Sequence, residues 1–170
     1  MNKPFSRIVV LAALLAVLCS APLQAQLLSK KTVSLELAKK VAAAAEAEAL
    51  KNNWTMVIVI VDEGANLVYL EKIDGTQLGS SDVALDKAKT ALRFKRPTKV
   101  FEDMVLKDGR MVILALPEGT MPIEGGLPLI VDGVPIGAIG VSGGKSTEDG
   151  VVAKAAVDAF TALVQAPANK

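Results

Sequence analysis

The short stretch most suggestive of chemistry is GVSGGKS, which runs from Gly140 to Ser146. Its first five residues fit the G-x-S-x-G pattern that presents the nucleophilic serine of many hydrolases. The same stretch is one residue short of the G-x-x-x-x-G-K-[ST] loop that binds phosphate groups. The pattern therefore raises two alternatives: nucleophilic attack by Ser142, and phosphate binding by the loop backbone.

The hydrolase alternative is weakened by the composition of the chain, which contains no histidine among its 170 residues. Histidine is the most common general base and the most common transition-metal ligand in proteins. Its absence excludes Ser-His-Asp and Cys-His catalysis, together with zinc sites built on histidine. Ser142 would need a lysine as its base, and Lys145 is the nearest one in the sequence. A serine hydrolase is therefore disfavoured.

The phosphate-loop alternative is disfavoured by its position. Phosphate loops connect an early strand of a parallel sheet to the helix that follows it, whereas this loop precedes the last predicted helix. Glu148 and Asp149 lie in the first turn of that helix. Their carboxylates already complement the positive end of the helix dipole, so nucleotide hydrolysis is not expected.

Two groups of charged residues offer further candidate sites. Six of the 18 acidic residues occur as three adjacent pairs without calcium-loop spacing, which favours solvated caps and turns over a site for iron or another divalent cation. Six of the 19 basic residues cluster in and after one predicted helix, which favours a solvated face, with a cationic lip for ligand carboxylates as the alternative. The pairs are Asp62/Glu63, Glu102/Asp103 and Glu148/Asp149, and the cluster contains Lys87, Lys89, Arg93, Lys95, Arg96 and Lys99.

The first 25 residues predict a secretory signal peptide, because Lys3 and Arg7 precede an apolar run that ends near a cleavage motif at Ala25. The alternative of a lipoprotein attached through Cys19 is weaker. Cleavage removes the only cysteine, so the mature chain has no disulfide or thiol chemistry. The signal holds two of the 19 basic residues and none of the 18 acidic ones, which leaves a mature charge of −1. We expect a periplasmic or secreted protein with no nucleic-acid partner and no membrane span after cleavage.

The remaining chain predicts one domain, residues 34–165, between an N-terminal extension (26–33) and a disordered tail (166–170). Apolar periodicity and turn residues predict a mixed fold of the α/β (α+β) class, with an antiparallel sheet of about five strands flanked by helices. We expect Ser34 to cap the first helix, and Ser146 with Asp149 to form a capping box for the last. The expected elements are a helix after Ser34, a hairpin over 54–74, helices over 82–94 and 98–109, a strand over 111–117, a hairpin over 127–141 and a helix over 151–164.

Glycines inside an apolar strand mark a second unusual feature. Gly137 and Gly140 interrupt the run from Val134 to Val141. Glycine weakens a strand interior, so its presence indicates a bulge or the close approach of another backbone or a ligand. This density of glycine predicts a shaped pocket or a tight subunit contact.

The glycine-rich segments together resemble the HbpS/GlcG-like family, whose members are also called haem-binding or haem-degrading domain proteins. The similarity covers most of the mature chain predicted after Ala25 and makes GVSGG a structural loop of that family. It is carried by Val61-Asp62-Glu63-Gly64, Asp74-Gly75, Ala84-x-x-Lys87-Ala88-x-Thr90-Ala91-x-x-Phe94, Glu124-Gly-Gly126-x-Pro128, Asp132-Gly133-x-x-Ile136-Gly137-Ala138-Ile139-Gly140-Val141-Ser142-Gly143 and Glu148-Asp149.

The resemblance implies a profilin-like three-layer fold and homo-oligomers of up to eight subunits. It implies a small-molecule ligand, with haem or iron the leading candidate, and it assigns no catalytic residue. The ligand-facing positions that it implies are Lys87, Thr90, Gly125, Gly126, Pro128, Gly143, Glu148 and Asp149.

Haem binding would need an axial ligand other than histidine. Tyrosine, methionine and lysine are the alternatives, and the candidates are Tyr69, Met104, Met111 and Met121. The leading hypothesis is an exported small-ligand binding protein of the HbpS/GlcG type. Two others remain open: an enzyme or accessory protein acting on a small organic acid through Lys87 and the Glu148/Asp149 region, and a structural homo-oligomer without a ligand.

Overall fold

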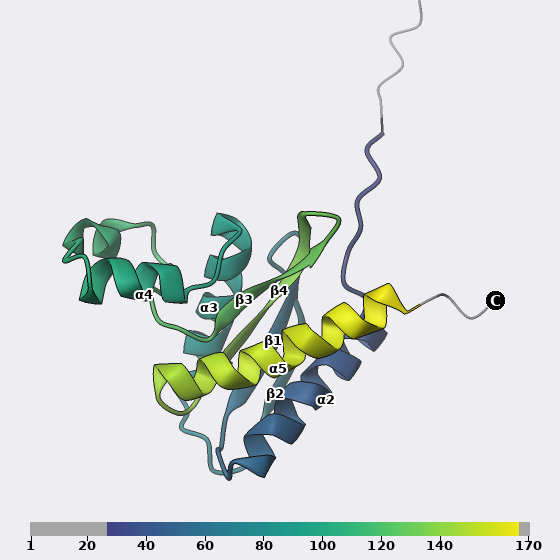
Figure 1. Cartoon of the computed structure of the whole chain (residues 1–170), viewed down its shortest axis with the longest axis horizontal. Coiled ribbons are helices and arrows are strands. Elements are labelled where there is room, and N and C mark those ends of the chain that lie inside the picture. The colour runs from purple at the N-terminus through teal and green to yellow at the C-terminus, as the bar shows by residue number, and fades with distance from the viewer. Residues whose placement is uncertain (1–26, 167–170) are drawn as a thin grey trace, which may run out of the picture.

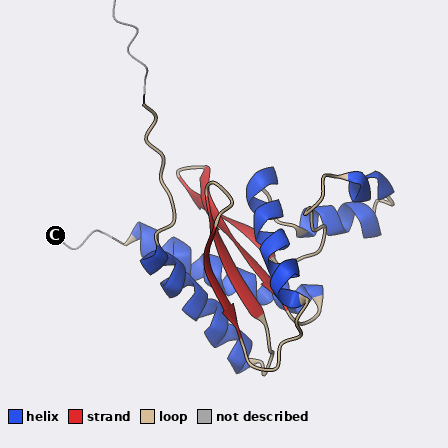
Figure 2. Cartoon of the chain, turned by 180° about the vertical axis from the view of Figure 1, so that it is seen from behind, coloured by secondary structure: helices blue, strands red, loops and turns tan. Residues whose placement is uncertain are grey.

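A computed structural model describes residues 27–166 of the chain. The predicted signal peptide lies outside these residues, as does all of the predicted tail except Ala166. Four antiparallel strands form one sheet between two layers of helices (Figures 1 and 2). The elements are α2 (Leu35–Lys51), β1 (Val57–Asp62), β2 (Leu67–Lys72), α3 (Ser80–Phe94), α4 (Lys99–Leu106), the 3-10 helix η1 (Met111–Ala115), β3 (Gly126–Val131), β4 (Val134–Ser142) and α5 (Ser146–Gln165).

The sheet has the order β2-β1-β4-β3, so β1 and β4 are its central strands. Successive side chains of a strand point to opposite faces, and both faces of β1 are covered. Val57, Val59 and Val61 pack in the cluster that includes α3. Ile58 and Ile60 pack in the cluster that includes α2 and α5. This double burial explains why the sequence of β1 is continuously apolar instead of alternating.

Small side chains let α2 lie close beside α5 on one face of the sheet (Figure 1). The buried face of α2 consists of alanines and Val41, and Ala153 and Ala156 of α5 lie in the same cluster. Ser34 caps α2 as predicted, since its Oγ accepts a hydrogen bond from the Leu37 N–H at 3.2 Å. Among residues 27–166, no helix is both long and apolar enough to cross a membrane.

Both predicted hairpins are confirmed, and the β3–β4 turn shows why. Asp132 and Gly133 have φ angles of 52° and 76°, so both central residues are left-handed, as the preferred two-residue hairpin turn requires. The glycines of β4 are explained by close approach of backbone. A Cβ on Gly140 would overlap the Ala84 carbonyl of α3, and one on Gly137 would lie 2.5 Å from the Val61 oxygen.

The predicted strand over 111–117 is wrong, and the sheet has four strands instead of about five. Residues Met111–Ala115 form the 3-10 helix η1, in which the Ile113 N–H donates to the Arg110 carbonyl oxygen at 3.1 Å. Met111 and Val112 are exposed. A short apolar run has no periodicity that separates a strand from other structure, and here the run lies beside α4 rather than beside a strand.

The predicted capping box of α5 is also wrong in its residues. The helix begins at Ser146, with Lys145 as its N-cap. The box is closed by Glu148, whose carboxylate accepts a hydrogen bond from the Lys145 N–H at 2.9 Å. Ser146 instead donates to Glu102 of α4 at 2.8 Å, and Asp149 makes a contact described below.

Candidate functional site

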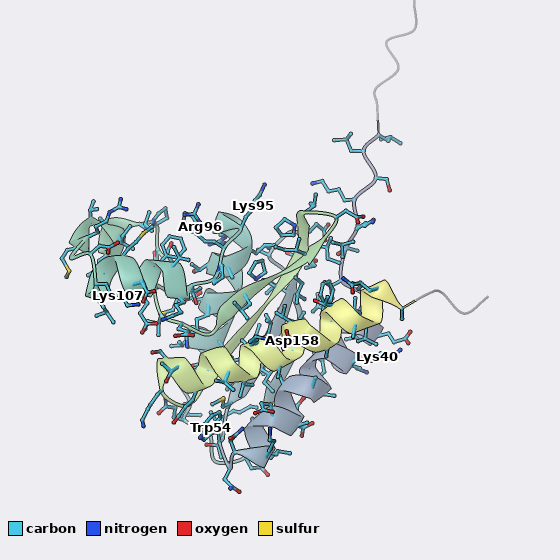
Figure 3. The ribbon with its side chains drawn as sticks, viewed as in Figure 1. Lys40, Trp54, Lys95, Arg96, Lys107 and Asp158 are labelled. Atoms are coloured by element: carbon cyan, nitrogen blue, oxygen red, sulfur yellow. The ribbon has the colours of Figure 1, made fainter. Side chains whose placement is uncertain are left out.

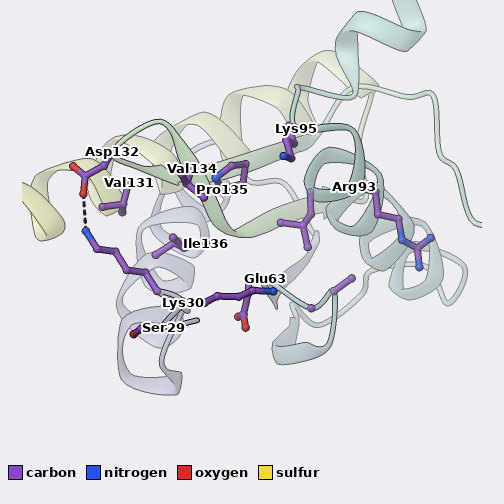
Figure 4. Close-up of a pocket in the computed structure, with 14 residues that line it drawn as sticks. Ser29, Lys30, Glu63, Arg93, Lys95, Val131, Asp132, Val134, Pro135 and Ile136 are labelled. Carbon is purple, nitrogen blue, oxygen red and sulfur yellow. Dashed lines mark hydrogen bonds and ion pairs between the residues drawn. The ribbon is translucent and has the colours of Figure 1, made fainter. Parts of the chain in front are cut away.

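A pocket of about 760 Å³ opens at the end of the sheet where both hairpins turn. This volume is within the range of small-molecule sites in proteins. The β1–β2 turn, the β3–β4 turn, the C-terminal end of α3 and the segment before α2 form its walls (Figure 4). The lining residues are Ser29, Lys30, Lys31, Glu63, Gly64, Ala65, Leu92, Arg93, Lys95, Val131, Asp132, Val134, Pro135 and Ile136.

One wall of the pocket is apolar because the ends of two central elements meet there. Val134, Pro135 and Ile136 begin β4, and Leu92 comes from the last turn of α3. Leu92 and Ile136 are buried, whereas Val134 is 60% exposed. The hairpin turn therefore leaves an apolar surface open to a ligand, although the same strand is buried farther along.

The rim of the pocket carries an excess of positive charge. Four cations line it, namely Lys30, Lys31, Arg93 and Lys95, against two carboxylates, Glu63 and Asp132. Lys31 is already engaged, since its Nζ lies 2.6 Å from Asp132 Oδ2 in an exposed ion pair (Figure 4).

The helix end determines where two of these cations lie. Lys95 is the left-handed C-cap of α3, with φ 54°, and its N–H donates to the Ala91 and Leu92 carbonyl oxygens. Cations at this end complement the negative end of the helix dipole. The Lys95 side chain extends away from the ribbon (Figure 3), so its ammonium is free to meet an anion.

The residues implied by the family resemblance lie elsewhere, and two of them form a buried ion pair. Lys87 Nζ lies 2.6 Å from Asp149 Oδ2, and the two side chains are 1% and 3% exposed. Lys87 also donates to the Val141 carbonyl oxygen at 3.0 Å. The pair links α3, on one face of the sheet, to α5, on the other. The interpretations of Lys87 as part of a solvated face and of Asp149 as a solvated cap are therefore wrong.

Glycines make room for this pair at the start of β3. A Cβ on Gly125 would lie 2.6 Å from the Val141 oxygen and 3.0 Å from Lys87 Nζ. Gly125 also has a φ angle of 125°, which residues other than glycine rarely adopt. Gly126 lies so close to the Lys87 carbonyl that a Cβ there would overlap it.

The Asp149 carboxylate is held from several directions. Its Oδ1 accepts a hydrogen bond from the Gly144 N–H at 3.1 Å. Burial raises the pKa of Asp149, and the Lys87 ammonium with the amides of Gly143 and Gly144 opposes that rise. A charge removed from water is stabilised by a paired, hydrogen-bonded partner. This arrangement therefore fixes the junction of two helices and the sheet.

The other implied residues have structural partners too. Thr90 Oγ1 accepts a hydrogen bond from the Met121 N–H at 2.8 Å, and Pro128 is buried in β3. Glu148 closes the cap of α5, and a Cβ on Gly143 would overlap the Thr55 carbonyl. None of the eight implied residues lines the pocket. Their role in ligand binding stays a prediction.

The candidate axial ligands for haem are also outside the pocket. Tyr69 donates from its hydroxyl to Glu71 at 3.0 Å and packs against the core. Met104 and Met111 belong to α4 and η1, and Met121 lies in the following loop. Within residues 27–166, no group of three or more His, Cys, Asp or Glu side chains is arranged to hold a metal ion.

The pocket itself was missed by sequence reasoning, although one signal pointed toward it. Arg93 and Lys95 belong to the basic cluster, whose alternative interpretation was a cationic lip for ligand carboxylates. The structure divides that cluster: Lys87 is buried, Lys99 pairs with Glu124 at 3.2 Å, and only two of its members reach the pocket. The apolar wall of the pocket is formed by segments that are far apart in the sequence, so no local sequence pattern predicted it.

Comparisons with known proteins agree with this fold. The family described as "Haem degrading protein HbpS-like" matches residues 33–158. Protein GlcG of Escherichia coli K12 is 40% identical over 114 residues, which are 67% of this chain and 84% of GlcG.

Two solved structures are similar over nearly their whole length. The Klebsiella pneumoniae protein ORFY has a TM-score of 0.75 and 32% identity, over 82% of this chain and 98% of that one. A structure described as the PduOC:heme complex has a TM-score of 0.69 and 28% identity, over 75% of this chain and 94% of that one. The chain belongs to the HbpS-like family of haem-degrading proteins.

Proposed function

We propose that the protein is an exported small-ligand binding protein and that haem is its ligand. The observation that carries this proposal is the pocket at the hairpin turns, which combines an apolar wall with a cationic rim. Haem presents the complementary chemistry, an apolar ring with two propionate carboxylates. The similarity to the HbpS-like family and to the PduOC:heme complex supports the same ligand.

The apolar and cationic residues that line the pocket fit the chemistry of haem. Val134, Pro135 and Ile136 would contact the ring, while Arg93 and Lys95 would bind the propionates. An arginine binds a carboxylate through two parallel N–H donors, which are among the stronger hydrogen bonds in proteins. Bound haem would supply its iron for ligand or redox chemistry, and the chain's contribution would be to hold and orient the ring.

Titration of haemin into the untagged protein tests this function. A histidine tag must be absent because it would supply the ligand that the chain lacks. We expect a saturable Soret shift, with the dissociation constant raised about tenfold by Arg93→Ser through loss of a charged hydrogen bond. Arg110→Ser is the matched control, because Arg110 is exposed and outside the pocket. Equal weakening by both variants, or no saturable shift, would remove haem from this pocket.

Export and self-association are further parts of the proposal. The sequence of residues 1–25 supports secretion to the periplasm or beyond. Leu106, Val112 and Leu114 are more than half exposed on α4 and η1, which supports a contact with another copy because monomers rarely expose large apolar patches. Native mass spectrometry of protein released from the periplasm tests both parts. We expect a subunit cleaved near Ala25 within a homo-oligomer. A full-length subunit would refute cleavage, and a lone subunit would refute assembly.

A further inference from the structure

We infer that the pocket recognises its ligand as an amphipathic dicarboxylate, through the apolar face and two carboxylates, and makes no bond to a metal. This inference rests on the proposed function but is narrower. It concerns which features of the ligand the pocket contacts, namely the apolar face and the carboxylates, and it predicts that a porphyrin without iron binds as well as haem.

The first argument is the set of side chains at the pocket. Strong axial ligands of haem iron are histidine, cysteine, methionine and tyrosine, and none of these residue types is among the side chains that line it. Met56 is fully buried in the core. Tyr69 and the methionines of residues 104–121 belong to elements that do not contribute to the pocket.

The remaining Lewis bases are poor candidates for iron. A lysine must lose its proton before it can ligate a metal, and Lys31 Nζ already lies 2.6 Å from Asp132 Oδ2 in an ion pair. Lys30 and Lys95 are exposed at the rim of the pocket. Glu63 is an exposed turn residue, so its bond to iron would have to compete with water.

The second argument is charge. Four cations and two carboxylates around the pocket leave an excess of two positive charges. A ligand with two carboxylates would neutralise that excess. Arg93 and Lys95 lie to one side of Val134, Pro135 and Ile136, while Asp132, which pairs with Lys31, lies to the other (Figure 4). A rigid body with an apolar face could therefore cover these three residues with both carboxylates on the edge that faces Arg93 and Lys95.

The third argument is that this recognition does not need histidine. The chain contains none, yet the family to which it belongs is described as haem-degrading. Recognition through propionates and ring contacts reconciles the two facts. Because the cations are exposed, the interaction should weaken as ionic strength rises.

Three ligands separate the contributions of ring, carboxylates and iron: haemin, metal-free protoporphyrin IX and haemin dimethyl ester. Quenching of the fluorescence of Trp54, the only tryptophan, or isothermal calorimetry reports binding of each to the untagged protein. We expect protoporphyrin to bind within about threefold of haemin, and the diester to bind about tenfold or more weakly because its carboxylates are blocked. Arg93→Ser should weaken haemin and protoporphyrin equally, and Arg110→Ser should change neither.

The outcomes distinguish this inference from the proposed function. If haemin binds and protoporphyrin binds more than about tenfold more weakly, a difference above 1.4 kcal/mol, iron coordination is required and the inference is wrong while haem binding stands. Equal binding of haemin and its diester would also overturn it, because carboxylates would then be irrelevant. If neither haemin nor protoporphyrin binds, the proposed function itself fails.

Discussion

Replacing Asp149 by alanine is expected to lower the free energy of unfolding by about 3–5 kcal/mol, because it leaves the Lys87 ammonium buried without its partner. The Lys87 side chain is 1% exposed, and its ammonium would retain only the Val141 carbonyl oxygen at 3.0 Å. Chemical denaturation monitored by circular dichroism measures the change. A loss of this size is a large fraction of the stability of a typical domain.

A double variant tests whether the unpaired charge of Lys87 causes the loss of stability. Lys87→Met combined with Asp149→Asn removes both charges and nearly keeps the volume of each side chain, so the double variant should be more stable than Asp149→Ala alone. Asp158→Ala provides a matched control, because Asp158 pairs with Lys154 on the exposed face of α5 (Figure 3). We expect Asp158→Ala to lower the free energy of unfolding by no more than about 1 kcal/mol. Equal losses for Asp149→Ala and Asp158→Ala would show that the buried pair contributes no more than a surface pair.

Substitution of Gly140 by alanine is expected to destabilise the protein by about 3 kcal/mol, because the added methyl has no space. The new Cβ would overlap the Ala84 carbonyl and lie 2.6 Å from the Ala88 nitrogen. Both atoms belong to the backbone of α3, which cannot move aside like the end of a side chain. The whole helix would have to lift from β4, which exposes the cluster of Val57, Val59 and Val61. Thermal and denaturant unfolding of the variant measure this loss.

Gly79→Ala is the matched control for this substitution. Gly79 has helical backbone angles, with φ −62°, and no atom lies within 4 Å of the position of its Cβ. We expect its stability to stay within about 0.5 kcal/mol of the wild type. If Gly140→Ala were equally mild, the close approach of α3 to β4 would not be what requires glycine there.

Features that depend on neighbouring residues were determined by the sequence itself. The Ser34 cap and the Asp132-Gly133 turn were predicted correctly because side chains or backbone angles within four residues determine them. The glycines of β4 also indicated the close approach of another backbone, although the sequence did not predict that α3 is the neighbour of Gly140. The absence of histidine excluded several chemistries without reference to any fold.

Features that join distant segments were decided only by the tertiary structure. The run from Met111 to Pro117 has strand-like composition, but it lies beside α4 and forms a 3-10 helix. In the sequence, Lys87 and Asp149 look like ordinary surface charges. They are 62 positions apart along the chain, yet Lys87 Nζ lies 2.6 Å from Asp149 Oδ2 in the structure. The pocket joins the segment before α2 to the end of α3 and to two hairpin turns. Hydrophobic packing joins residues at any separation along the chain, so burial and pocket formation depend on which helices and strands meet in the fold. Caps and turns depend instead on hydrogen bonds and backbone angles of residues that are adjacent in the sequence.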